Sequence, residues 1–97
     1  MAWRNPASYP FSTSSILLNA PHESGVYALF NKTTWVYVGE SRNIRAQLMG
    51  HLNGDIACIA MFPSLTFSYE LLLPLICPWR LSEVISELRP VCNTRLD

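Results

Sequence analysis

Two tyrosines stand in short glycine-containing motifs that follow one another closely. Gly25-Val26-Tyr27 precedes Tyr37-Val38-Gly39, with ten positions from the first tyrosine to the second. Arg42 and Arg45 come directly after and are near enough in sequence to form a local cationic cluster. Such clusters bind the phosphates of nucleic acid. The pattern raises a nucleic-acid hypothesis, although the tyrosines taken alone are more typical of aromatic packing between neighbouring strands.

The cysteines offer no recognisable chemistry. Cys58, Cys77 and Cys92 are separated by 19 and 15 positions, and no Cys or His pair has the spacing of a zinc site. Their number is odd and buried free cysteine is common, so we interpret all three as small core residues. This interpretation fits a reducing compartment.

The composition limits the size of the fold and the kinds of partner to be expected. The 97 residues leave room for one domain with one core. Hydrophobic residues make up 49% and charged residues 14%, against about 25% charged in ordinary soluble domains, so we expect uncovered apolar surface and self-association or a protein partner. The net charge of zero argues against tight sequence-independent binding of nucleic acid.

The most apolar stretch, residues 56–77, raises the question of a membrane span. Pro63, Ser64, Ser68, Glu70 and Pro74 interrupt it, so we expect no membrane helix. Residues 1–20 hold only a short apolar run and predict no secretory signal. The expected location is cytoplasmic.

The elements that must position the two tyrosines follow from the apolar patterning. A β-rich run, a turn and a second β-rich run predict a hairpin, and alternating residues farther on predict a third strand. Apolar stripes at helical spacing predict two helices, the first capped by Ser41. The expected strands are 25–30, 35–39 and 65–71, and the expected helices are about 41–52 and 79–88. We predict an α+β fold, a small three-stranded, mostly antiparallel sheet with helices packed on it, in a domain 21–97 preceded by an N-terminal arm 1–20.

The paired motifs resemble those of the GIY-YIG nuclease superfamily. Glu40 to Ile44 is similar to the start of that family's first helix, and Ile85 through Arg89-Pro90 to Asn93 is similar to its closing helix and asparagine. The resemblance covers about residues 24–95. It implies metal-assisted hydrolysis of phosphodiesters, with a helix arginine on the phosphate and a glutamate of the last helix holding a divalent cation, usually magnesium.

Carried over position by position, the resemblance names the candidate site. Tyr27, Tyr37 and His51 match catalytic positions, and Gly39 and Asn93 match further motif positions. Arg42 and Gln47 are the remaining candidates for binding, and Gln47 stands at the family's arginine position. Three of these residues also have a purely structural interpretation. His51 is then a structural residue of its helix, Gly39 is the residue that lets the strand end, and Asn93 is a cap of local backbone.

Two positions depart from the family pattern. Gln47 stands where the arginine belongs, ten residues after Tyr37, and Leu81 stands where the glutamate belongs, twelve before Asn93. Arg45 and Glu83 lie two residues from these positions, about 200° around a helix, and should point away. Leu81 continues an apolar stripe and should pack in the core. We therefore expect no metal ligand in the chain and no cofactor, with magnesium only if the chain is active.

Three functions stay open on the sequence. The leading one is a nuclease-like domain with impaired, vestigial catalysis that binds nucleic acid or a protein partner. The second is an active metal-dependent DNA endonuclease with unorthodox ligands. The third is a structural domain that forms homo-oligomers, favoured by the neutral charge and apolar composition.

Overall fold

A tight hairpin forms the centre of the sheet. The computed structural model describes residues 3–94, and in it β2 (Gly25–Phe30) and β3 (Trp35–Ser41) pair antiparallel as predicted. The side chain of Asn31 holds the turn, because its Oδ1 accepts hydrogen bonds from the backbone N–H groups of Thr33 and Thr34. In this register Tyr27 lies opposite Gly39, and Leu29 lies opposite Tyr37.

The sheet has four strands, so the prediction of three was wrong. β4 (Thr66–Leu71) pairs with β2 as expected, and β1 (Tyr9–Pro10) pairs with the outer edge of β4, giving the order β1-β4-β2-β3. β1 is two residues long and ends in proline, which a strand tolerates only at an edge. So short a strand carries no alternating pattern by which it could be predicted.

The first twenty residues contain regular structure beyond β1. α1 (Thr13–Asn19) begins after Ser12, whose side chain accepts a hydrogen bond from the Ser15 N–H. Ile16 of this helix is fully buried in the core. The segment expected to be an arm therefore packs on the sheet.

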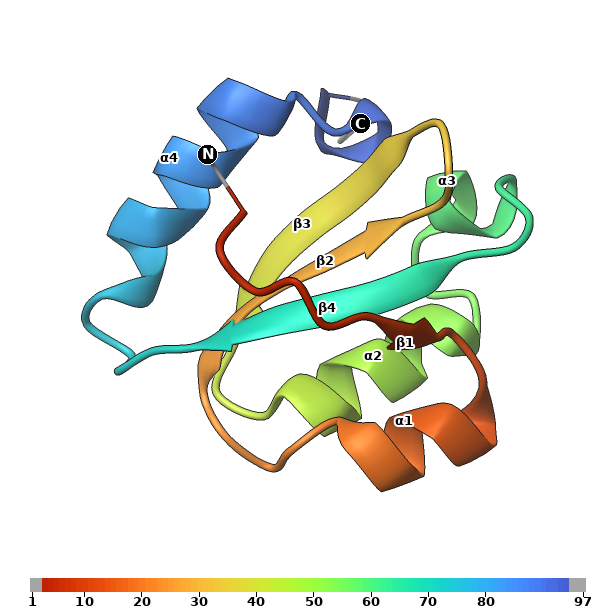
Figure 1. Cartoon of the computed structure of the whole chain (residues 1–97), viewed down its shortest axis with the longest axis horizontal. Coiled ribbons are helices and arrows are strands. Elements are labelled where there is room, and N and C mark those ends of the chain that lie inside the picture. Colours follow the sequence, from red (N-terminus) through yellow and green to blue (C-terminus); the bar gives the residue numbers. More distant parts are fainter. Residues whose placement is uncertain (1–2, 95–97) are drawn as a thin grey trace.

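Helices cover both faces of the sheet (Figure 1). α1 and α2 (Ile44–Leu52) pack on the face that carries Tyr27 and Leu29, and α4 (Cys77–Leu88) packs on the face that carries Val26 and Val38. Two short elements complete the chain, α3 (Ala57–Ala60) and the 3-10 helix η1 (Val91–Thr94). No helix within residues 3–94 is both long and apolar enough to cross a membrane.

The helix ends differ slightly from the sequence expectation. Asn43, rather than Ser41, caps α2, because its Oδ1 accepts from the Ala46 N–H while Ser41 still belongs to β3. α4 ends at Leu88, as predicted, and the next residue, Arg89, adopts a left-handed conformation with φ of 48° before Pro90.

Two of the cysteines are not free. Cys58 of α3 and Cys92 of η1 form a disulfide, with Cα atoms 5.7 Å apart, whereas Cys77 is a buried free thiol. The interpretation of all three as free core residues was therefore wrong for this pair. The disulfide also removes the support that free cysteines gave to a reducing compartment.

Candidate active site

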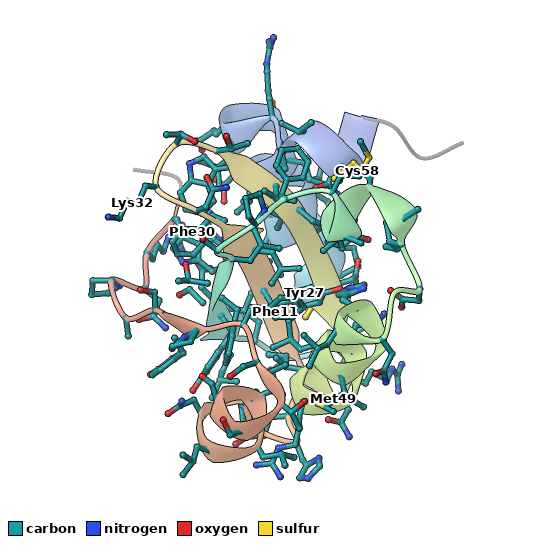
Figure 2. All side chains as sticks on the ribbon, turned by 90° about the vertical axis from the view of Figure 1, so that its right-hand side faces the viewer. Phe11, Tyr27, Phe30, Lys32, Met49 and Cys58 are labelled. Atoms are coloured by element: carbon teal, nitrogen blue, oxygen red, sulfur yellow. A yellow bond between two sulfur atoms is a disulfide. The ribbon has the colours of Figure 1, made fainter. Side chains whose placement is uncertain are left out.

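The two motif tyrosines lie on the same face of the sheet. Tyr27 of β2 and Tyr37 of β3 are diagonal neighbours in the hairpin register, and their ring centroids are 6.3 Å apart. The ring of His51, from α2, contacts both, with centroids 5.5 Å from Tyr27 and 5.2 Å from Tyr37. The hairpin and α2 thus bring the three candidate catalytic residues into one cluster. Figure 2 labels Tyr27, the member of the cluster that comes from β2.

A chain of hydrogen bonds links Tyr27, His51 and Asp55. The Tyr27 hydroxyl lies 2.6 Å from Nε2 of His51, and Nδ1 of His51 lies 2.8 Å from Oδ1 of Asp55. Because an ionised carboxylate only accepts, Nδ1 donates to Asp55, and Nε2 is left to accept from the Tyr27 hydroxyl. Asp55 was not among the residues predicted from the sequence. It lies three positions beyond Leu52, the last residue of α2, and follows Gly54 with φ of 89°, so helical spacing gave no signal for it.

The buried part of this cluster is closed to solvent. Tyr27 is 1% exposed and His51 is 3% exposed, so neither can contact a substrate while the fold stays as it is. Burial raises the pKa of Tyr27 far above its ordinary value, and Tyr37 and Asp55 raise it further. Burial and Asp55 also raise the pKa of Tyr37. Both phenols are therefore neutral hydrogen-bond donors at physiological pH, and the partly buried Tyr37 is the more accessible one.

The raised pKa of Tyr27 predicts a sensitivity to alkali. The unfolded chain ionises its tyrosines near pH 10 while folded Tyr27 stays protonated, so stability is complete below pH 10 and falls above it. Between pH 8 and pH 11 the free energy of unfolding should fall in the wild type. In Tyr27→Phe the fall should be smaller by about 1 kcal/mol. Urea unfolding at the two pH values measures this. An identical loss in both proteins would show that Tyr27 ionises normally.

Gly39 is required by space. A Cβ atom at this position would collide with the hydroxyl of Tyr27 and lie 2.7 Å from its Cζ. The backbone of Gly39 is not left-handed, and β3 continues to Ser41. The interpretation of Gly39 as the residue that lets the strand end was therefore wrong. The glycine of the second motif makes room for the tyrosine of the first.

Asn93 binds the edge of β3. Its Oδ1 accepts from the Val38 N–H and its Nδ2 donates to the Val38 carbonyl, each at 2.8 Å. The side chain thus replaces a neighbouring strand at this residue. This geometry matches the interpretation of Asn93 as a backbone cap, and it fixes η1 against the sheet.

The positions that depart from the family pattern carry no substitute charge. Leu81 packs against the apolar cluster between α4 and the sheet, as expected. Arg45 points away from the tyrosines, because its Nε donates to the Ala20 carbonyl at 2.7 Å. Glu83 is half exposed and is held by Arg80 at 2.6 Å. Gln47 is partly buried one turn before His51, and Arg42 is exposed where β3 leads into α2.

The residues present do not fit a magnesium ion. Magnesium prefers carboxylate oxygens, and Leu81, at the position where the resemblance predicts a carboxylate, is an apolar side chain in an apolar cluster. Within residues 3–94 no three His, Cys, Asp or Glu side chains gather closely enough to hold a metal. Asp55 is the carboxylate beside the tyrosines, and it already accepts from His51.

Solved structures confirm the fold. The GIY-YIG N-terminal endonuclease domain of UvrC from Thermotoga maritima, bound to its catalytic magnesium, superposes with a TM-score of 0.67 at 22% identity, over 79% of this chain and 90% of that one. A tyrosine-to-phenylalanine point mutant of that domain, also bound to its catalytic divalent cation, gives 0.66 at 23% identity, over 79% and 89%.

The sequence comparisons agree over a shorter length. UvrABC system protein C of Actinobacillus succinogenes is 33% identical over 48 residues, which are 48% of this chain and 8% of that protein. No family model matches the sequence. The predicted resemblance is thus confirmed as a fold: this chain has the α+β architecture of a GIY-YIG endonuclease domain.

Proposed function

We propose, from the GIY-YIG fold of this chain, that it is a nuclease-like domain that interacts with nucleic acid without magnesium-dependent cleavage. The observation that carries the proposal is the packing of Leu81 in the apolar cluster under α4, at the position where the family has its metal-binding glutamate. An aliphatic side chain offers no oxygen to a hard cation.

The second departure acts in the same direction. Gln47 is neutral, so the site lacks the fixed cationic donor that would stabilise charge developing on a phosphate. Removing one such donor typically lowers the rate by about 10²–10³. The accessible groups that remain are the phenol of Tyr37 and the exposed guanidinium of Arg42, which support weak contact with nucleic acid.

An active endonuclease with unorthodox ligands is the second candidate. Asp55 favours it, because its carboxylate side chain is 45% exposed and raises the pKa of both Tyr27 and Tyr37. Against it, a single carboxylate that already accepts from His51 leaves few oxygens for a cation. A metal held there would require the Asp55–His51 bond to open.

Restoring the two missing groups tests the proposal. We expect the wild type and Gln47→Arg to show no magnesium-dependent NMR shifts at the hairpin, and Leu81→Glu to show them. Groups that act as a unit are strongly non-additive, so only the double variant should gain magnesium-dependent cleavage of branched DNA. Leu88→Glu is the matched control, since Leu88 packs against the same cluster from the same helix but does not stand at the position where the family has its glutamate.

The outcomes separate the candidates. Magnesium shifts at Asp55 in the wild type would favour the active enzyme. A folded double variant that binds no magnesium would contradict the view that only the charged groups are missing from the site. Binding of labelled branched DNA, measured by anisotropy, should weaken in Arg42→Gln and with rising salt.

A further inference from the structure

The loop between β4 and α4, with the residues at its two ends, exposes several large apolar side chains. We call this set of side chains the loop face and define it by five residues that are each about half exposed or more. Their exposed fractions are 48% for Leu71, 74% for Leu73, 87% for Leu75, 47% for Ile76 and 80% for Trp79. The largest apolar patch on an ordinary monomer covers about 300–600 Å² and is often functional.

The backbone under the loop face is fixed. Leu72 is anchored to Ser24 by two hydrogen bonds, one to its carbonyl from the Ser24 hydroxyl at 2.6 Å and one from its N–H to the Ser24 carbonyl at 3.2 Å. The Leu73 carbonyl accepts from the N–H groups of Ile76 and Cys77, and the Cys77 side chain is buried. The apolar side chains are therefore presented outward by an ordered loop, which lowers the entropy lost on binding.

The rim of the loop face carries both signs of charge. Arg4 and Glu83 have side chains that are 67% and 51% exposed, and their charged atoms approach to 4.0 Å. An isologous contact requires one patch to complement itself after a two-fold rotation. A rim with one cation and one anion meets this requirement when Arg4 of each copy exchanges its long contact with Glu83 of its own chain for Glu83 of the other copy, while Arg80 keeps its 2.6 Å bond to Glu83. The net charge of zero adds no repulsion between copies.

Shape points to the same occupant. A hollow of about 400 Å³ lies beside Trp79, lined by Pro78, Ser82 and Glu83. A second hollow, of about 430 Å³, lies beside Leu71 and Leu72, lined also by Arg4 and Glu70. Projecting apolar side chains and receiving hollows on one surface are what a self-complementary contact needs, and tryptophan is among the residues that most often dominate binding energy.

We propose that the loop face is a homodimer interface that packs against the same face of a second copy. The assignment goes beyond the proposed interaction with nucleic acid and does not depend on it. The loop face includes the start of α4, whereas Tyr27 and Tyr37 pack in the cluster on the α2 side of the sheet. α4 and α2 lie on opposite faces of the sheet (Figure 1).

Sedimentation equilibrium on the full chain tests this proposal. We expect the wild type to move from the 11.0 kDa monomer to twice that mass between low micromolar and submillimolar concentration. Leu75→Glu and Trp79→Glu should each stay monomeric over the whole range. Both side chains are at least 80% exposed, so the folded state should tolerate the changes, as circular dichroism will show. Leu18→Glu is the control, because Leu18 is 83% exposed but lies on α1, away from the loop face. This variant should dimerise like the wild type.

Other results would overturn the assignment. A wild type that stays monomeric at submillimolar concentration excludes the homodimer, and a dimer that persists in Leu75→Glu and Trp79→Glu places the interface elsewhere. Co-sedimentation of the wild type, but not of Trp79→Glu, with phosphatidylcholine vesicles would make a lipid surface the occupant instead.

Discussion

Arg80→Met is expected to destabilise the fold by about 3–5 kcal/mol, because it leaves the carboxylate of Glu70 buried without its partner. Arg80 and Glu70 have side chains that are 5% and 9% exposed. They form a bidentate pair, with Nε to Oε1 at 2.7 Å and Nη2 to Oε2 at 2.9 Å. The pair joins α4 to β4 beneath the loop face, so its loss should be felt throughout the domain. Urea denaturation measures the change.

Arg80→Met should also change how stability depends on pH in the acid range. Burial by itself would raise the pKa of Glu70, but hydrogen bonds from Arg80 and the Arg4 N–H outweigh burial and leave the pKa below its ordinary value. A lowered folded pKa gives stability that is present above the unfolded pKa, about 4.3, and lost as the pH falls through the folded value. Arg80→Met should lose this contribution.

Two controls separate the ion pair from a general effect of the substitution. Arg42→Met removes an exposed cation and should cost less than about 0.5 kcal/mol. Glu70→Leu combined with Arg80→Met removes both charges and should recover much of the loss, since apolar residues often replace a buried pair at little cost. A single Arg80→Met variant as stable as the wild type would show that Glu70 is solvated in solution.

Reduction of the Cys58–Cys92 disulfide is expected to produce the second large effect. The bond closes a loop that spans 34 positions of the sequence and ties α3 to η1. Releasing a loop of this length costs about 3–4 kcal/mol in the chain-entropy account. A domain of this size loses ~4–8 °C of Tm per kcal/mol, so Tm should fall by at least about 12 °C. Melting curves with and without a phosphine reductant measure it, with mass spectrometry after alkylation to count the free thiols.

The third cysteine provides the matched control. Cys77→Ser should keep the full response to the reductant, because Cys77 is a free thiol in α4. Cys58→Ala combined with Cys92→Ala should melt near the reduced wild type and ignore the reductant. If three alkylated thiols were found without reductant, the disulfide would be absent from the protein in solution.

Local patterning predicted the parts of the fold that neighbouring residues determine. The hairpin from Gly25 to Ser41 and the alternating strand β4 follow from periods that a few residues reveal. The apolar packing of Leu81 was also predictable, because Leu81 belongs to an apolar stripe at helical spacing. These features needed no knowledge of tertiary contacts.

What the sequence could not predict depends on distant residues meeting. The Cys58–Cys92 bond and the contact of Tyr9–Pro10 with β4 join segments whose spacing carries no signal. The reason for Gly39 became visible only once the ring of Tyr27 was placed beneath it. Asp55 lies four residues after His51 but beyond the end of α2, and nothing in the sequence said that this histidine is buried and needs an acceptor.

Cleavage by the purified wild type tests the central claim most directly. The account predicts a domain with the GIY-YIG fold and no metal centre, so plasmid and branched DNA should remain uncut in magnesium, with the same background in a chelator. The double variant with Gln47→Arg and Leu81→Glu, assayed in parallel, shows that the conditions permit cleavage. Nicking by the wild type that magnesium supports, a chelator abolishes and Tyr37→Phe removes would contradict the account.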